Sequence, residues 1–507
     1  MPTTFSSFLR IVLALIAAGT LSVASAQDAA KDRPQPSAVE HRETGKGVLR
    51  LLPTDAVTEH SINTSNGTLA YTATAGTLAF YDQSGDQSAS VFYTAYVVKD
   101  APPNRPLTFV FNGGPGAASA FLHLGLVGPR ILELGPDGRD AARATLRDNP
   151  DTWLTFTDLV LIDPIGTGWS RTAKHDDAKS FWSVQSDAGA MAKAIALYVA
   201  KNNRAGSPKY LFGESYGGFR AAKTARALQS EQGIITSGII MLSPLLEGWL
   251  TFGDDQSALN AALQLPSLAA AELERKNAFS FDALAAAEKY AMTDYLTTLA
   301  GAPPKGEAAK AFYDRVAKMT GLPADAVAQA RGFAANAYVK TLRAPEGKIV
   351  SRYDATFAVD DPHPERRSSR SPDPILDVVS RAYGGAMVSY ARNELGFRTD
   401  MTYTLLASDV HWDWQNGRLQ ASAEDDLRTL LAYDSSFRLL IAHGYSDMIT
   451  PYAMTRYVLD HMPSFDPPGR AQLKLYRGGH MIYLDPESRK AFSADASAFY
   501  QRGMSKS

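Results

Sequence analysis

A serine flanked by glycines is the strongest chemical signal in the chain. Gly213-Glu214-Ser215-Tyr216-Gly217 matches the pattern G-x-S-x-G, with Ser215 at its centre. A strand-like run at residues 210–212 precedes it, and a helix-forming run at 219–228 follows it. Such a turn is sharp, so small residues are needed on both sides of the serine. The context predicts a nucleophile elbow that lifts the serine hydroxyl above a sheet edge. The alternative is an ordinary strand–helix turn with a capping serine.

A serine hydroxyl becomes nucleophilic beside a base that takes its proton, and that base needs a carboxylate to orient it. His480 lies on a glycine-rich loop after the strand-like run 473–476, and Asp447 lies on a loop after the run 437–442. Both follow strands, as Ser215 does, and the chain order serine, acid, histidine is the order of this kind of site. We predict that Ser215 is the nucleophile, Asp447 the acid and His480 the base.

Acyl transfer also needs two hydrogen-bond donors for the oxyanion of the intermediate. In this architecture the backbone N–H of the residue after the nucleophile, here Tyr216, provides one, and a loop after an earlier strand provides the other. Residues 112–116 (Asn-Gly-Gly-Pro-Gly) follow the apolar run 107–111 and are the obvious loop, because glycine lets backbone approach a substrate closely. The alternative is a tight turn, which would use one glycine rather than three.

Composition excludes or disfavours several other chemistries. The chain has no cysteine, which excludes disulfides, thiolate nucleophiles and cysteine-ligated metals. It has no H-E-x-x-H motif and no pair of histidines at helical spacing, so we expect no metal and no cofactor. His443 is expected to shape the loop before Asp447, and His123 and His411 to lie in the core or on the surface. Lys and Arg number 51 and Asp and Glu 53, which argues against a nucleic-acid partner.

Short apolar runs alternate with helical stretches such as residues 188–200, which predicts a mostly parallel sheet with functional groups at the carboxyl ends of its strands. Ahead of them, residues 49–99 alternate with a period of two between Gly, Asn and Asp, which predicts a β-meander. The predicted meander segments are 69–73, 78–80 and 91–97, and the predicted core strands are 107–111, 159–162, 210–212, 239–242, 437–442 and 473–476.

The character of the sequence changes after about Leu246. Between residues 259 and 341 the chain is rich in alanine and has helical periodicity, which predicts a helical insertion between two parts of the sheet. A polar, proline-rich stretch around 360–374 then leads back to the first domain. The predicted helices are 259–265, 281–298, 306–319 and 324–342.

The first 26 residues resemble a targeting segment. Arg10 is their only charge, residues 11–24 are apolar, and Ala24-Ser25-Ala26 is a small-residue cleavage site. This predicts a signal peptide cut before Gln27, because a membrane anchor needs about 20 apolar residues. We expect a secreted or periplasmic protein that has no membrane association after the signal is removed.

Six blocks, in order over almost the whole mature chain, resemble the serine carboxypeptidase family of α/β-hydrolases. The helical insertion also falls where the family has one. The blocks are N-G-G-P-G at 112–116, N-P-x-x-W at 149–153, D-P-I-G-T-G-W-S at 163–170, G-E-S-Y-G-G at 213–218, G-Y-S-D at 444–447 and G-G-H-M at 478–481.

The resemblance implies a serine carboxypeptidase that removes C-terminal residues from peptides through an acyl-enzyme. By position, Gly114 and Tyr216 would supply the oxyanion N–H groups. Asn112 and Glu214 would bind the free carboxylate of the peptide. Since a carboxylate beside another carboxylate favours a shared proton, the pKa of Glu214 should be raised, and cleavage should favour acidic pH.

This chain departs from the family pattern at several positions. Val110 stands where eukaryotic members have Trp, and Ala117 where they have Cys. A family Glu that partners the Glu before the serine falls on Leu126, and Glu133 would replace it only if the loop shifts.

We therefore predict an α/β-hydrolase with a mostly parallel central sheet, an N-terminal β-meander and a helical lid. The alternative functions are an esterase or acyltransferase with the same triad, or a catalytically silent binding protein. For the oligomeric state, the sequence is compatible with a monomer or a homodimer. The predicted organisation is a signal peptide (1–26), a flexible leader (27–48), a first core part (49–245), a helical insertion (246–374) and a second core part (375–507).

Overall fold

The computed structural model describes residues 46–65, 67–135, 140–254, 256–366 and 373–504. The chain divides into two units, Met1–Val39 and Glu40–Ser507, and all described residues belong to the second. The predicted signal peptide and residues 27–45 of the predicted leader lie outside the described part.

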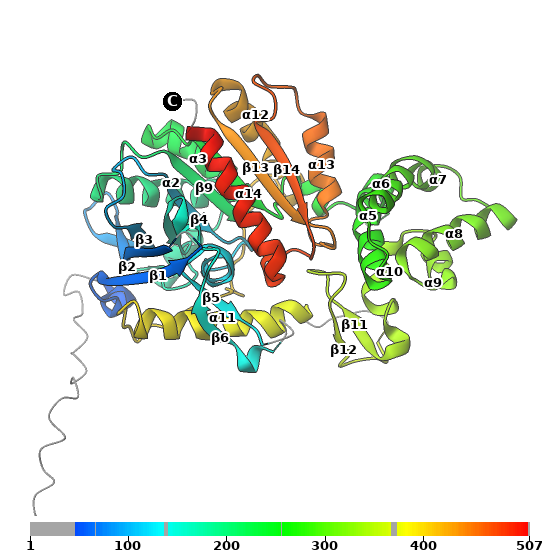
Figure 1. Cartoon of the computed structure of the whole chain (residues 1–507), viewed down its shortest axis with the longest axis horizontal. Helices are drawn as coiled ribbons and strands as arrows, with labels where there is room; N and C mark the ends of the chain where they lie inside the picture. Colours follow the sequence, from blue (N-terminus) through cyan, green and yellow to red (C-terminus); the bar gives the residue numbers. More distant parts are fainter. Residues whose placement is uncertain (1–45, 66, 136–139, 255, 367–372, 505–507) are drawn as a thin grey trace, which may run out of the picture. The chain divides into compact units, whose positions relative to one another are not determined.

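A ten-stranded sheet forms the centre of the protein and can be followed in Figure 1 from β1 in blue to β14 in orange. Its order is β1-β2-β3-β7-β4-β9-β10-β13-β14, with β8 paired to β3. Six neighbouring strands, β7, β4, β9, β10, β13 and β14, run parallel to one another. The strands β1, β2 and β3 form an antiparallel meander that joins β7. The predicted fold class is confirmed. The strands are β1 (Ala56–Thr64), β2 (Gly67–Tyr81), β3 (Gln87–Val98), β4 (Leu107–Phe111), β7 (Asp158–Ile162), β8 (Arg171–Thr172), β9 (Lys209–Glu214), β10 (Gly238–Leu242), β13 (Arg438–Gly444) and β14 (Ala471–Tyr476).

The six predicted core strands lie on observed ones, but the meander differs from the prediction. Segments 69–73 and 78–80, predicted as separate, belong to the single strand β2, and β1 was not predicted at all. Gly76 lies between these two predicted segments, and it pairs with Tyr93 inside the ladder. A Cβ atom there would lie 2.4 Å from the side chain of Asp55, so this glycine permits a close approach and not a turn.

Helices cover both faces of the sheet. Successive residues of a strand point to opposite faces, and in β4 Phe109 and Phe111 contribute to one buried cluster while Val110 contributes to the other. The first cluster includes α2, α3, α12 and α13, and the second includes α11 and α14. These helices are α2 (Val184–Lys201), α3 (Tyr216–Gln232), α11 (Pro374–Asn393), α12 (Glu424–Tyr433), α13 (Tyr452–His461) and α14 (Pro486–Met504).

Shorter elements lie between strands of the large sheet along the chain. Two two-stranded ribbons, β5 with β6 and β11 with β12, pair antiparallel. Two short helical segments follow the turn after β4, and α4 follows β10. Their bounds are β5 (Arg130–Glu133), β6 (Thr145–Asp148), β11 (Lys348–Val350), β12 (Ala358–Asp360), α1 (Ala120–Leu122), η2 (His123–Val127) and α4 (Gly248–Thr251).

The alanine-rich region forms helices with a buried cluster of their own. The stretch predicted as one helix at 324–342 is two, because Arg331 and Gly332 both have positive φ and end α9. The predicted helix 259–265 is the start of a longer one, α5, which continues through Pro266. These helices are α5 (Ala258–Arg275), α6 (Phe281–Tyr290), α7 (Leu296–Ala300), α8 (Gly306–Thr320), α9 (Ala324–Gln329) and α10 (Ala334–Thr341), with the π-helical turn η6 (Ala291–Tyr295) between α6 and α7.

A buried ion pair joins α2 to α3, the helix that begins directly after the predicted nucleophile. Arg220 of α3 and Asp187 of α2 lie 2.7 Å apart, and their side chains are 1% and 6% exposed. Arg220 also donates to the carbonyl oxygen of Asn112 in the turn after β4. Removing one member of a buried pair leaves an uncompensated charge, which costs several kcal/mol.

We expect Asp187→Asn to lower the free energy of unfolding by about 3–5 kcal/mol. The double variant Asp187→Leu, Arg220→Met should recover much of that loss, since it removes both charges. Urea denaturation followed by tryptophan fluorescence measures both values. A loss for Asp187→Asn below about 1 kcal/mol, the range of exposed pairs, would contradict this account.

Candidate active site

Ser215 joins β9 to α3 in a strained conformation. Its φ of 61° and ψ of −127° are rarely adopted by a residue with a side chain, so the surrounding structure must hold it there. The Ser215 N–H donates to the Leu242 carbonyl, and the Ser215 carbonyl accepts from the Gly218 N–H, both at 2.9 Å. A Cβ atom on Gly213 would lie 1.9 Å from the carbonyl oxygen of Gly217. The elbow therefore requires the small residues that flank the serine.

His480 and Asp447 meet where two neighbouring parallel strands end. His480 follows β14 and Asp447 follows β13, and the imidazole Nδ1 lies 2.9 Å from the Asp447 Oδ2. The other carboxylate oxygen accepts the backbone N–H groups of Ile449 at 2.8 Å and Thr450 at 3.1 Å. Since Nδ1 faces the carboxylate, Nε2 is the ring nitrogen left to exchange a proton with a nucleophile.

The electrostatics of this pair suit a base held by an ionised acid. Burial acts to raise the pKa of Asp447, but His480 and the hydrogen bonds it receives outweigh burial, so its pKa lies below the ordinary range. Burial acts to lower the pKa of His480, but the Asp447 carboxylate outweighs it and raises that pKa. Each group thus stabilises the charged form of the other.

Ser215 and His480 line one cavity of about 150 Å³ at the carboxyl ends of the strands. Asp447 is fully buried behind the imidazole. Asn112, Gly114, Glu214 and Tyr216 line the same cavity. The structure therefore brings the predicted site residues together. The apolar part of the wall comprises Phe121, Leu245, Phe252, Leu376, Leu406, Trp414, Ile449 and Met481.

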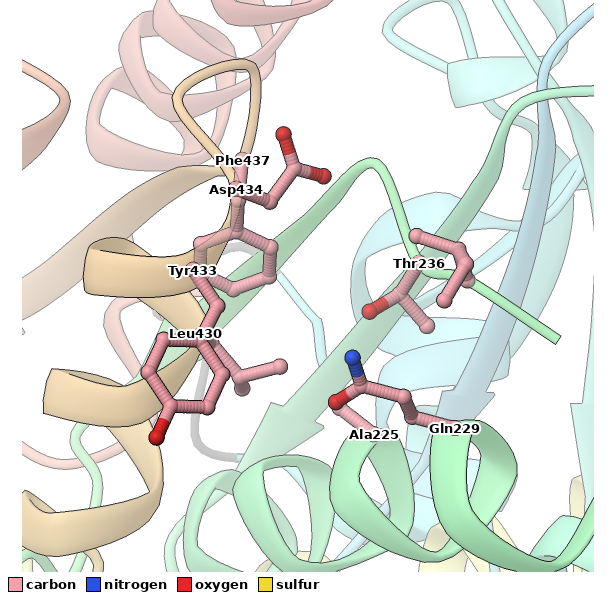
Figure 2. Close-up of a pocket in the computed structure, with 8 residues that line it drawn as sticks. Ala225, Gln229, Thr236, Leu430, Tyr433, Asp434 and Phe437 are labelled. Atoms are coloured by element: carbon pink, nitrogen blue, oxygen red, sulfur yellow. The ribbon is translucent and has the colours of Figure 1, made fainter. Parts of the chain in front are cut away.

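A second hollow, between α3 and α12, lacks these features (Figure 2). Its volume is about 20 Å³, and no histidine lies on its wall. Tyr433 on its rim is 78% exposed. It has no pairing of nucleophile and base, so we assign no chemistry to it. Its wall comprises Ala225, Gln229, Ile235, Thr236, Leu430, Tyr433, Asp434 and Phe437.

The glycine turn after β4 touches the elbow directly. A Cβ atom on Gly113 would lie 2.6 Å from the Tyr216 nitrogen and from the Glu214 carbonyl oxygen. The Gly113 carbonyl accepts the Ala117 N–H at 3.1 Å. Because N–H and C=O point in opposite directions across a trans peptide, the Gly114 N–H points away from that bond. With φ at 104°, Gly114 also adopts a conformation that favours glycine.

Glu214 is a buried carboxyl group within this cavity wall. It is 4% exposed, and its Oε2 accepts from the Asn112 Nδ2 at 2.7 Å and from the Tyr483 hydroxyl at 3.1 Å. Asn112 is fixed in turn, because its Oδ1 accepts the Leu122 N–H at 3.0 Å. Burial raises the pKa of Glu214 to about 7. The direction agrees with the prediction, but in the free protein burial is the largest cause of the raised pKa, and the Asp447 carboxylate contributes less.

Tyr483 is a site residue that sequence reasoning missed. Leu126, at the position of the family Glu, is fully buried in the core, and Glu133 forms an ion pair with Arg147 at 2.7 Å. Tyr483, and neither of these two residues, donates a hydrogen bond to Glu214. The only available signal was its place three residues after His480.

The remaining predictions concern histidines, metals and membranes. His443 is buried, with its Nε2 2.8 Å from the Thr455 hydroxyl, and His123 is buried against the Tyr96 hydroxyl at 2.6 Å. Within the described residues, no group of three or more His, Cys, Asp or Glu side chains is arranged to hold a metal ion. In that same part of the chain, no helix is both long and apolar enough to cross a membrane.

Known serine carboxypeptidases and serine carboxypeptidase-like proteins match this sequence. A family model described as serine carboxypeptidase matches residues 70–472. From Arabidopsis thaliana, serine carboxypeptidase-like 44 is 37% identical over 82 residues, 16% of each chain, and serine carboxypeptidase-like 42 is 32% identical over 148 residues, 28% of each. The matches thus span less than a third of these relatives' length.

A solved structure shares the fold. It is that of Kex1(delta)p, a prohormone-processing carboxypeptidase from Saccharomyces cerevisiae. It superposes with a TM-score of 0.53 and 15% identity, covering 85% of this chain and 92% of that chain.

The raised pKa of Glu214 predicts a pH dependence of stability. Glu214 stays protonated in the folded protein up to about pH 7, whereas in the unfolded chain it ionises near 4.5. The folded state therefore binds more protons between these values, and stability falls as pH rises through this window. We expect this loss, ~3 kcal/mol, to be absent in Glu214→Gln.

The measurement is urea denaturation of both proteins from pH 4 to 8. The free energy of unfolding of Glu214→Gln relative to the natural protein should rise steadily between about pH 4.5 and 7. A difference that stays constant across this window would show that Glu214 is not a buried neutral acid.

Proposed function

The chain belongs to the serine carboxypeptidase family, and we propose that it is an exported serine carboxypeptidase that releases C-terminal residues from peptides. The observation that carries this proposal is the single cavity that Ser215 and His480 share with Asn112 and Glu214. Ser215 and His480 suit acyl transfer. Asn112 and Glu214 suit the binding of a free carboxylate. Export would depend on the predicted signal peptide.

The proposed reaction proceeds through an acyl-enzyme. Ser215 Oγ attacks the carbonyl carbon of the last peptide bond while His480 Nε2 takes its proton. The N–H groups of Gly114 and Tyr216 stabilise the oxyanion of the tetrahedral intermediate. His480 then donates the proton to the leaving amine, which breaks the peptide bond. Water repeats the sequence on the ester, with Ser215 as the leaving group.

Recognition of the free C-terminus depends on Glu214 being protonated. A peptide carboxylate in a largely apolar cavity needs hydrogen-bond donors, because an unpaired buried charge is costly. Below about pH 7 the Glu214 carboxyl group has a proton to donate. The Asn112 amide has two N–H groups, one of which is used by Glu214. When Glu214 ionises, it repels the substrate, so cleavage should favour acidic pH.

The cavity wall also favours particular side chains. Apart from Glu214 and His480, its side chains carry no charge, and Phe252 and Trp414 contribute aromatic surface. Burial of apolar surface contributes roughly 25 cal/mol per Å². We therefore propose peptides with apolar side chains beside the scissile bond as the preferred substrates.

We expect Ser215→Ala to abolish covalent labelling by a fluorophosphonate probe, since this probe reacts with an activated serine hydroxyl. Labelled protein is quantified on a gel, and Tyr433→Ala, a truncation on the exposed surface of α12, serves as control and should label normally. Persistent labelling of Ser215→Ala would remove Ser215 as the nucleophile.

A matched pair of peptides tests the choice of substrate. We expect a peptide with a free C-terminus to be cut at least about tenfold faster at pH 5 than the same peptide as its C-terminal amide, because only the free acid pairs with Asn112 and Glu214. Mass spectrometry of the products gives both rates. Equal rates would favour an endopeptidase, cleavage of small esters alone would favour an esterase or acyltransferase, and no turnover of either kind would favour a binding protein.

A further inference from the structure

One loop of the helical insertion contacts both catalytic loops. Residues 351–357 connect β11 to β12, and three backbone hydrogen bonds tie this loop to the sheet side of the site. The His480 N–H donates to the Tyr353 carbonyl at 2.6 Å, and the Met448 N–H donates to the Arg352 carbonyl at 3.0 Å. The Ala355 N–H donates to the Ser446 carbonyl at 2.9 Å. The loop thus connects the segment that carries His480 to the segment that carries Asp447.

The side chain of Tyr353 packs on the base itself. Its ring centroid lies 5.1 Å from that of the His480 imidazole, at an interplanar angle of 80°. This edge-to-face geometry is favourable and restricts rotation of the imidazole. The backbone is equally close, because a Cβ atom on Gly479 would lie 2.0 Å from the Tyr353 carbonyl oxygen. Both the backbone and the ring of His480 therefore rest against Tyr353.

The loop is anchored at its start and in its middle. Asp373, the N-cap residue of α11, accepts from the Ser351 hydroxyl at 2.5 Å and from the Arg352 N–H at 2.7 Å. The same Ser351 oxygen accepts the Tyr353 N–H at 3.0 Å. In the middle of the loop, Asp354 accepts from the Ser446 hydroxyl at 2.7 Å. These contacts join the loop to α11 and to the segment that carries Asp447.

We propose that the 351–357 loop is a positioning element for the catalytic base and that Tyr353 is its positioning residue. The Tyr353 carbonyl fixes the backbone of His480, and its ring holds the imidazole in the orientation that keeps Nδ1 on Asp447. This inference rests on the proposed function, since it concerns the base of that reaction. It also gives the helical insertion a part in assembling the catalytic site.

Tyr353 also shields the imidazole from water. Burial disfavours the protonated imidazole, so loss of the ring would admit water and raise the pKa of His480. The neutral base would then form only at higher pH. The titratable side chains that act on His480 from the neighbouring elements are Asp447, Glu214, Asp373 and His443. None of them changes in a Tyr353 variant.

The test is the rate of fluorophosphonate labelling of Ser215 as a function of pH, which involves no peptide substrate. We expect Tyr353→Ala to label about tenfold more slowly, with the acid limb of the profile moved to higher pH by about half a unit or more. Tyr353→Phe keeps the ring and should stay within about twofold of the natural protein. Tyr433→Ala on α12 is the matched control and should not change the profile.

Two outcomes would overturn the proposal. One is a Tyr353→Ala profile that matches the natural protein, and the other is a Tyr353→Phe rate as low as that of Tyr353→Ala. If Tyr353→Ala fails to fold, Tyr353→Leu takes its place, because leucine fills part of the space without an aromatic ring. A labelling rate of Tyr353→Leu equal to that of Tyr353→Phe would then overturn the proposal. Labelling that persists in Ser215→Ala would instead refute the proposed function.

Discussion

The backbone of the turn after β4 touches the backbone of the elbow after β9, and the positions of the reacting groups follow from this contact. Gly113 has no space for a Cβ atom against Tyr216, and Gly213 has none against Gly217. These contacts hold Ser215 at a positive φ that it would not otherwise keep. The same proximity places the Gly114 and Tyr216 backbone beside one cavity. A strained serine and its two candidate oxyanion donors are thus parts of one arrangement.

Burial changes the charge state of Glu214, the residue before Ser215. Glu214 lies inside the wall and is kept neutral below about pH 7 by desolvation, and its hydrogen bonds with Asn112 and Tyr483 fix its orientation. A neutral carboxyl group is a donor, whereas an ionised one accepts only. The site therefore places a proton donor next to the proposed nucleophile, Ser215, whose proposed base lies beside an ionised carboxylate, Asp447. Two carboxyl groups of this site therefore differ in charge, since Glu214 is neutral below about pH 7 and Asp447 is ionised.

The groups that a local pattern defines could be predicted from the sequence. Ser215 and His480 follow strands of the parallel sheet, so their place at one edge follows from the topology. Tyr483 and Tyr353 could not be predicted, because their roles depend on tertiary contacts with Glu214 and His480 that no local pattern marks. The two segments of β2 were predicted as separate for a similar reason. The sequence alone does not distinguish a glycine inside a strand, such as Gly76, from a glycine in a turn.

We propose that a protonated Glu214 binds the carboxylate of the peptide. The most direct test is the ratio of kcat/KM for a free-acid peptide to that for its amide from pH 4 to 9, in the natural protein and in Tyr483→Phe. The Tyr483 hydroxyl stabilises the ionised form of Glu214 and so lowers its pKa. We predict that the ratio falls near pH 7 in the natural protein and that this midpoint moves by about half a unit or more to higher pH in Tyr483→Phe. A ratio that is independent of pH, or a midpoint that does not move, would contradict the account.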